Sequence, residues 1–169
     1  YRLHPLSMAE LDGAKNTTWQ PGQEIHFPSA RPSTFDTLWT FGGFPEQVAK
    51  QTERSLRRWH QERTDRLIKE DIRDVEIIRD LSALQILVHL LPDKVGSLFS
   101  VNSLREDLQV AHKTVSLWVD ILEKFYYHFR IYPWQSSVIK SLRKEPKLYL
   151  WDWSEIQDPG ARLENIVAS

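Results

Sequence analysis

The segment 110–123 constrains the fold more than any other part of this chain. Apolar side chains recur there at positions i, i+3, i+4 and i+7, which lie on one face of an α-helix. The residues of this face are Val115, Trp118, Val119 and Leu122. We therefore expect an amphipathic helix with one buried side. The polar residues expected on its water-facing side are His112, Lys113, Ser116, Asp120 and Glu123.

A shorter helix is expected just before this segment. Leu104 and Leu108 mark its apolar side, and Gln109 and Val110 leave room for only a tight turn. Two helices joined by roughly three or four residues form a helix-turn-helix unit, in which the second is the recognition helix. Upstream of both, the apolar residues between positions 84 and 91 predict a third, buried helix.

Two short strands are expected after the helix-turn-helix unit. Residues 126–132 alternate and are rich in aromatic side chains, which is a strand signature, and residues 147–151 are their expected partner. Residues 135–146 between them are expected to form a loop, the wing. Three helices followed by a two-stranded ribbon is the element order of a winged helix. The expected fold class is therefore mainly α with a small β-ribbon.

The upstream part of the chain is expected to be largely helical. Ser33 is a candidate cap for a helix that runs to Phe41, where the glycines at 42 and 43 end it. Pro45 suits the first turn of the next helix. Residues 46–91 contain no Gly and no Pro, so a long helical region with a break near residue 80 is expected. Its interleaved charges favour a solvated face over a contact with nucleotide or DNA.

Cap and turn signals locate further boundaries. Ser7 with Glu10 three residues later is a capping-box pattern for a short first helix. A similar pattern at Ser82 places the start of the buried helix near that residue. Residues 158–160, Asp-Pro-Gly, favour a turn, and a last helix is expected from Arg162 onward.

Composition limits the partners that the chain as a whole can attract. The formal net charge is −1, so any surface for nucleic acid must be local. The chain has no Cys, which excludes disulfides and is compatible with a reducing compartment, so a cytoplasmic location is expected. No apolar run reaches the roughly 18–20 residues that a membrane helix needs, and no membrane partner is expected.

Five stretches, taken together, are typical of one family. They are LHPLS at 3–7, GGFPE at 42–46, EDI at 70–72, the helix-turn-helix unit, and KLYLWD at 147–152. With them the chain resembles the prokaryotic AAA-type ATPases that carry a C-terminal domain of unknown function, itself similar to restriction-endonuclease folds. The resemblance covers almost the whole chain, and GGFPE is its most specific part.

The resemblance implies a domain order. In that family a P-loop domain comes first, and a helical segment, a winged helix and the nuclease-like domain follow. The implied division is 1–45 for the end of the ATPase core and a connecting loop, 46–81 for a helical lid-like segment, 82–152 for the winged helix, and 153–169 for the start of a truncated nuclease-like domain. The chain is thus expected to be a fragment of an ATP-hydrolysing protein that uses ATP and magnesium.

No catalytic centre, cofactor or metal site is expected within the chain itself. It has no G-x-x-x-x-G-K-[ST] array to cradle phosphates, so it is expected not to hydrolyse ATP alone. The resemblance matches Glu164 to the first-helix Glu of the nuclease-like domain, but one Glu cannot supply a two-metal site. The six His show no ligand spacing. The chain departs from the family at Glu70, where Arg is usual, and at Ala111, where Ser or Thr usually caps the recognition helix.

A local excess of basic residues marks the expected contact with DNA. A duplex carries closely spaced phosphates, so affinity depends on clustered cations. The first turn of the recognition helix also favours phosphate through its dipole and free N–H groups. Asp120 and Glu123 lie further along the helix and are expected to repel the DNA backbone. Arg130, on the strand that precedes the wing, adds to the basic excess. The expected nucleic-acid-binding residues are His112, Lys113, Ser116, Lys140, Arg143, Lys144 and Lys147.

Some residues allow both a structural and a functional interpretation. Asp152 is interpreted as the cap of a turn rather than as a catalytic carboxylate. The aromatic strand 126–132 is interpreted as core rather than as a surface that stacks bases. The winged helix itself leaves two alternatives open, DNA contact and protein contact, because its exposed helix face is mixed in sign. A protein partner or a homo-oligomer is the second expectation.

Overall fold

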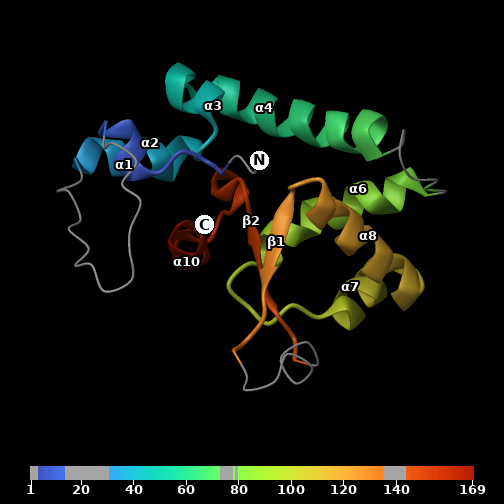
Figure 1. Cartoon of the computed structure of the whole chain (residues 1–169). Helices are drawn as coiled ribbons and strands as arrows, with labels where there is room; N and C mark the ends of the chain where they lie inside the picture. Colours follow the sequence, from blue (N-terminus) through green and yellow to red (C-terminus); the bar gives the residue numbers. More distant parts are fainter. Residues whose placement is uncertain (1–3, 14–30, 73–77, 79, 135–143) are drawn as a thin grey trace.

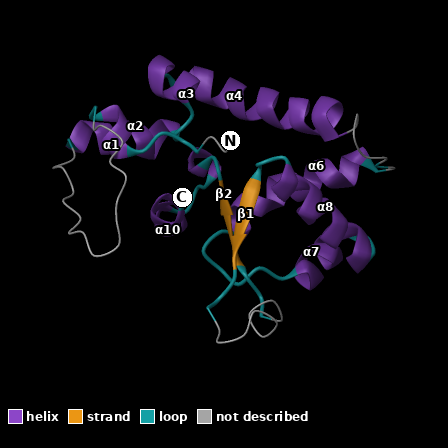
Figure 2. Ribbon diagram, in the orientation of Figure 1, coloured by secondary structure: helices purple, strands orange, loops and turns teal. Residues whose placement is uncertain are grey.

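A computed structural model describes residues 4–13, 31–72, 78, 80–134 and 144–169 (Figure 1). Most of the described chain is helical, and its one sheet pairs β1 (His128–Ile131) with β2 (Lys147–Leu150) in antiparallel order (Figure 2). The expected fold class, mainly α with a small β-ribbon, is confirmed. The helical elements are α1 (Met8–Leu11), α2 (Pro32–Phe41), α3 (Pro45–Lys50), α4 (Glu53–Arg66), η1 (Leu67–Ile72), α6 (Leu81–Leu90), η2 (Leu91–Lys94), α7 (Val101–Leu108), α8 (His112–Lys124), η3 (Trp153–Glu155) and α10 (Pro159–Ala168). No described helix is both long and apolar enough to cross a membrane.

Helices α7 and α8 form the expected helix-turn-helix unit. Gln109 follows α7 with a φ of 55°, and this left-handed residue makes the tight turn into α8. The four apolar residues expected on one face of α8 are all buried, which confirms the expected register of this helix. They join one apolar cluster that extends from Leu38 to Ile156 and includes the buried face of α6.

The ribbon follows α8 and is anchored at its base to the segment before α7. His128 pairs with Leu150 and Ile131 pairs with Lys147. Leu98 adds an isolated antiparallel bridge to Lys147, so a third chain segment joins the ribbon. The strand that was expected from residue 126 begins only at His128, because Tyr126 has a φ of 57° and turns the chain out of α8.

Helix α10 covers the free side of β2. The Asn165 side chain is fully buried and makes two hydrogen bonds to the backbone of Leu150. Its Oδ1 accepts from the Leu150 N–H at 2.7 Å, and its Nδ2 donates to the Leu150 carbonyl at 2.8 Å. The amide of Asn165 thus contacts β2 much as a neighbouring strand does.

Glycines end α2 as expected. Gly42 has a φ of 76° and a ψ of −175°, a conformation that is essentially restricted to glycine. A Cβ atom on Gly42 would lie 2.6 Å from Oδ1 of Asp152, and one on Gly43 would lie 2.6 Å from the Trp153 ring. The turn after α2 therefore needs glycine both for its backbone angles and for its close approach to the segment 152–153.

Three expected helix starts are wrong. Helix α2 begins at Pro32, so Ser33 lies inside its first turn and does not cap it. Asp80 caps α6, because its side chain accepts from the Ala83 N–H, so Ser82 is not the cap. Residues 158–160 form the cap and first turn of α10 rather than a separate turn. A proline at the first helical position explains the early starts of α2 and α10, since it needs no acceptor for an N–H.

The region 46–91 is not one long helix up to residue 80. Helix α3 ends at Lys50, and the next residue, Gln51, has a φ of 46°. Thr52 then caps α4 by accepting from the Ser55 N–H at 3.3 Å. Helix α4 continues directly into η1, a short π-helix. The expected break near residue 80 is present at the Asp80 cap, but the break at residues 51–52 was not expected.

Candidate nucleic-acid interface

A hollow of about 250 Å³ lies at the N-terminal end of α8. His112 and Lys144, both expected to contact DNA, line it together with Asn102 from the start of α7. All three side chains are exposed. Lys144 makes no ion pair within the described ranges, although Glu145 lines the same hollow. The fold thus brings the start of α8 and the residues just before β2 to one place.

The first turn of α8 has no side-chain cap. Ala111 occupies the N-cap position and offers no acceptor, as expected for Ala in place of Ser or Thr. In the described part of the chain, the N–H groups of His112 and Lys113 have no hydrogen-bond acceptor. These donors and the positive end of the helix dipole favour an anion beside the hollow.

The other expected contact residues differ in their availability. Lys113 is exposed and Ser116 is half-buried. Lys147 donates to Glu164 at 2.8 Å, and this bond is the main reason why the pKa of Glu164 is lowered. Tyr149 donates to the same carboxylate oxygen at 2.8 Å. Lys147 is therefore engaged within the fold. The remaining two, Lys140 and Arg143, lie outside the described residues.

Arg130 pairs with two acidic residues of α8. Its Nε lies 3.0 Å from Oε2 of Glu123, and its NH2 lies 2.7 Å from Oδ1 of Asp120. Its backbone N–H also donates to Glu123 at 3.0 Å. Arg130 is therefore not free to hold a phosphate. It also reduces the repulsion that Asp120 and Glu123 were expected to exert on DNA.

One large apolar side chain lies on the exposed face of α8. Leu117 is 52% exposed, between Lys113 and Asp120 along the helix. An apolar side chain at this position contributes little to binding of phosphate groups, but it contributes to the affinity of a protein contact. The exposed face of α8 therefore carries charged groups that suit DNA and an apolar group that suits a protein partner.

A buried polar cluster joins α4 to the end of the ribbon. Asp152 is 1% exposed and caps η3 by accepting from the Ser154 N–H at 3.2 Å, which agrees with its interpretation as a cap. Its second oxygen accepts from the indole N–H of Trp59 at 3.0 Å. Nε2 of His60 lies 2.8 Å from Oγ of Ser154.

Glu155 is the second buried carboxylate of this cluster. NH1 of Arg63 lies 3.1 Å from one Glu155 oxygen and 3.7 Å from Asp152. The Tyr127 hydroxyl donates to the other Glu155 oxygen at 2.7 Å. Burial raises the pKa of Glu155 to about 7, against the opposing charge of Arg63. Burial also lowers the pKa of His60, against the attraction of Asp152.

Sequence reasoning missed this cluster as a unit, because its members are far apart in the chain. His60 and Ser154, for example, are 94 positions apart. One signal was available. His60 and Arg63 occupy helical positions on the apolar side of α4, beside Trp59 and before Leu67, where a polar residue needs a buried partner.

The cluster does not have the geometry of a hydrolase triad or a metal centre. Ser154 donates to Asp152 rather than to His60, and Asp152 lies 4.0 Å from the same His60 nitrogen that faces Ser154. A triad needs the carboxylate on the other ring nitrogen. His60, Asp152 and Glu155 offer ligand atoms within 4.8 Å of one another, but the Arg63 guanidinium already pairs with both carboxylates. We assign no metal to this cluster.

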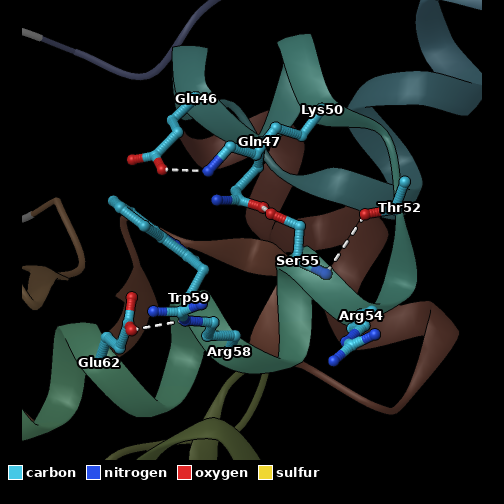
Figure 3. A pocket seen from close by; sticks show the side chains of 9 residues that line it. All are labelled: Glu46, Gln47, Lys50, Thr52, Arg54, Ser55, Arg58, Trp59 and Glu62. Atoms are coloured by element: carbon cyan, nitrogen blue, oxygen red, sulfur yellow. Dashed lines mark hydrogen bonds and ion pairs between the residues drawn. The ribbon is translucent and has the colours of Figure 1, made fainter.

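A larger hollow, of about 460 Å³, lies between α3 and α4 (Figure 3). Its charges are mostly paired with one another: Lys50 with Glu46 at 2.7 Å, and Arg58 with Glu62 at 2.6 Å. This pairing agrees with the interpretation of the Arg-rich helix as a solvated face. Trp59 lines the hollow and also takes part in the buried cluster.

Comparisons with known proteins give a family but no activity. The chain is 24% identical over 120 residues to an uncharacterized protein of Mycobacterium tuberculosis, Rv2008c, and equally to Mb2031c of Mycobacterium bovis; this covers 71% of the chain and 27% of each relative. It is 36% identical over 87 residues to the uncharacterized protein MJ1637 of Methanocaldococcus jannaschii, covering 50% of the chain and 18% of that protein. The chain thus spans about a quarter of the length of its mycobacterial relatives. No solved structure matches it significantly. Residues 32–154, most of the chain, match a family described as a domain of unknown function, and the chain belongs to this family, DUF8612.

Proposed function

We propose that the winged-helix region, residues 82–152, contacts duplex DNA as part of a longer ATP-hydrolysing protein of the AAA type. One observation carries the DNA contact. The hollow at the start of α8 combines His112 and Lys144 with the free N–H groups of an uncapped helix. Positive charge and N–H donors at one place are what a phosphate group needs.

The charge distribution supports a shallow mode of binding. The N–H donors of the first turn of α8 share the hollow with Lys144, which has no ion pair among the described residues, whereas Asp120 and Glu123 lie further along the helix and are held by Arg130. The helix is therefore expected to enter a groove only by its first turn, while the wing holds phosphate. Such binding is weak, sensitive to salt and poorly selective for sequence, because phosphate contacts carry no direct sequence information.

The ATPase part of the proposal rests on the resemblance in the stretches LHPLS, GGFPE, EDI and KLYLWD. The chain spans 27% of the mycobacterial relatives and 18% of the archaeal one, so those proteins have room for further domains. ATP and magnesium are the proposed cofactors of the whole protein, and the cytoplasm is its proposed location. ATP turnover by the full-length protein, against a variant with a substituted P-loop Lys, tests this part.

A pair of matched variants tests the DNA contact. His112→Ala combined with Lys144→Gln removes both side chains from the hollow. Lys124→Gln removes one exposed positive charge from the last turn of the same helix. Fluorescence anisotropy with a labelled duplex at low salt is expected to show a clear loss of affinity for the first variant and little change for the second. Equal losses would mean that only overall charge attracts DNA.

Protein contact is the second candidate, and exposed Leu117 favours it. In this case α8 presents Leu117 to a protein partner or to a second copy of the chain. Leu117→Ser is expected to leave DNA affinity unchanged if DNA is the ligand. If the chain instead self-associates through α8, sedimentation velocity will show an oligomer that this substitution dissociates.

A further inference from the structure

Two exposed aliphatic side chains flank Lys147 on one face of the ribbon. Ile131 of β1 pairs with Lys147 of β2, and Leu98 forms an antiparallel bridge to the same residue from the other side. Directly opposed residues of antiparallel strands point their side chains to the same face of a sheet. Ile131 is 45% exposed and Leu98 is 64% exposed, so apolar surface borders Lys147 on both sides.

Helix α10 lies beside β2 and extends this surface (Figure 1). Glu164 bonds to Lys147 and to Tyr149 at 2.8 Å each, so its carboxylate lies on the same face of the ribbon as these two side chains. Val167 follows Glu164 by three residues, which makes the two neighbours on the helix surface, and Val167 is 80% exposed. We define the ribbon patch as Leu98, Ile131, Lys147, Glu164 and Val167.

The ion pair at the centre of the ribbon patch can accept further partners. Side-chain exposure is 42% for Lys147 and 39% for Glu164. Lys147 and Tyr149 both bond to Oε1 of Glu164, so Oε2 has no hydrogen-bond partner among the described residues. The ammonium group of Lys147 has three N–H donors, and Glu164 takes one of them. The patch therefore offers an open donor and an open acceptor within an aliphatic border.

We propose that the ribbon patch is the interface of a two-fold symmetric dimer of this chain. A two-fold axis brings the same surface of both copies together, so the surface must be complementary to itself. The ribbon patch meets this condition, because Lys147 of each copy can donate to Oε2 of Glu164 of the partner subunit. Both contacts form at once, and the aliphatic side chains around them leave water together.

The chemistry of the ribbon patch favours a second copy over other partners. Its one positive and one negative charge cancel, so the patch does not attract the phosphates of DNA. Exposed aliphatic side chains that lie together are typical of protein contacts. A different protein would need a matching pair of opposite charges, at the matching distance and in the opposite order. A second copy supplies that pair by symmetry.

The proposed interface leaves the hollow at the start of α8 open. Arg130 lines that hollow and directly precedes Ile131 on β1. Successive side chains of a strand point to opposite faces, so the ribbon patch and the hollow lie on opposite faces of the ribbon. The inference therefore does not depend on DNA binding, and it concerns a surface other than the one that contains Leu117.

An exchange of charges tests the dimer directly. Sedimentation velocity of the whole chain over a concentration series is expected to show a monomer–dimer equilibrium. Lys147→Glu and Glu164→Lys each place like charges opposite one another at both contacts, so each variant alone is expected to remain monomeric. An equimolar mixture of the two variants pairs opposite charges at both contacts and is expected to recover the dimer.

Further variants separate the interface from the fold. Leu98→Ser combined with Val167→Ser is expected to weaken the dimer by about tenfold or more, because two aliphatic side chains no longer leave water. Leu117→Ser, at a similarly exposed position of α8, is expected to leave the dimer unchanged. Circular dichroism checks that each variant is folded. The double variant Lys147→Glu with Glu164→Lys keeps opposite charges both within and between the copies, and it is expected to dimerise.

Three results overturn the proposal. The first is an unchanged chain that is monomeric over the whole concentration series. The second is a dimer that persists in both single charge variants, or a mixture of the folded variants that stays monomeric. The third is a dimer that Leu117→Ser dissociates while the substitutions at Leu98 and Val167 do not. If a single charge variant does not fold, the double charge variant and the aliphatic variants still decide the outcome.

Discussion

Trp118 links the sequence pattern of the recognition helix to the stability of the fold. Its side chain is 4% exposed and lies with Val115, Val119 and Leu122 on the buried face of α8. Trp118→Ala is expected to cost about 3–5 kcal/mol, because it removes a large aromatic group and leaves a cavity. Urea unfolding measures this cost, and Leu117→Ala, at an exposed position, is the control. An unchanged unfolding midpoint for Trp118→Ala would be incompatible with the register of α8.

Substitution of Gly42 tests whether its close contact with Asp152 adds to the energetic cost of a side chain at a positive φ angle. Gly13 and Gly42 both have positive φ angles, of 77° and 76°. A Cβ on Gly13 meets nothing within 4 Å, whereas one on Gly42 lies 2.6 Å from Oδ1 of Asp152. Each substitution by Ala is expected to cost about 1–3 kcal/mol for the backbone conformation. Gly42→Ala should cost clearly more, because Asp152 must move. Equal losses in thermal unfolding would show that the contact adds nothing.

At the scale of elements, Asn165 makes the hydrogen bonds by which α10 holds the ribbon. Asn165→Ala leaves the N–H and carbonyl of Leu150 without these partners. Each buried group left unpaired costs about 1–3 kcal/mol. Leu163→Ala, on the exposed side of the same helix, should cost little. Hydrogen exchange of the Leu150 amide provides a local measurement, and faster exchange is expected in Asn165→Ala alone. Unchanged exchange would mean that α10 does not protect this strand.

The elements that could be predicted from the sequence are those set by local chemistry. The apolar spacing of α8, the tight turn at Gln109 and the glycine stop at Gly42 all follow from residues close in sequence. Boundaries failed where two nearby residues could serve as the cap. Asp80 rather than Ser82 caps α6, and a left-handed Gln51 breaks the helical region with no Gly or Pro to indicate it.

The candidate site was predictable to a similar extent. The sequence predicted that a DNA contact would combine the wing with the first turn of the recognition helix, and in the structure Lys144 and His112 line one hollow. The partners of Arg130 and Lys147 were not predictable, because ion pairing depends on which acidic residues the fold brings near. The buried polar cluster depends on contacts between residues far apart in the chain, such as Arg63 and Glu155, which are 92 positions apart, and a periodic pattern carries no information on such contacts.

At the scale of the whole molecule, two buried groups give opposite pH dependences of stability. Burial lowers the pKa of His128 from 6.5 to about 4, so its contribution is present above 6.5 and is lost as pH falls through about 4. Burial raises the pKa of Glu155 from 4.5 to about 7, so its contribution is present below 4.5 and is lost as pH rises through about 7. Each group changes the free energy of unfolding by up to about 1.4 kcal/mol per pH unit, and the two changes have opposite signs where the two pH ranges overlap.

Single variants should reveal the two slopes. With His128 alone, in Glu155→Gln, the free energy of unfolding is expected to rise between pH 4.5 and pH 6.5. With Glu155 alone, in His128→Gln, it is expected to fall over the same range. Urea unfolding at several pH values measures both. Parallel profiles for the two variants would contradict the opposite pKa directions.

The proposed DNA contact is tested most directly by the salt dependence of duplex binding by the whole chain. Affinity for a labelled duplex is measured across salt concentrations for the unchanged chain and for a variant in which Lys140, Arg143 and Lys144 are all replaced by Gln. The unchanged chain is expected to bind weakly, with log affinity falling linearly against log salt by about 0.9 per phosphate contact. The variant is expected to lose binding, or to keep a slope reduced by about one for each lost contact. Binding that the triple substitution leaves unchanged, or no binding by the unchanged chain at low salt, would contradict the proposed DNA contact and favour a protein partner.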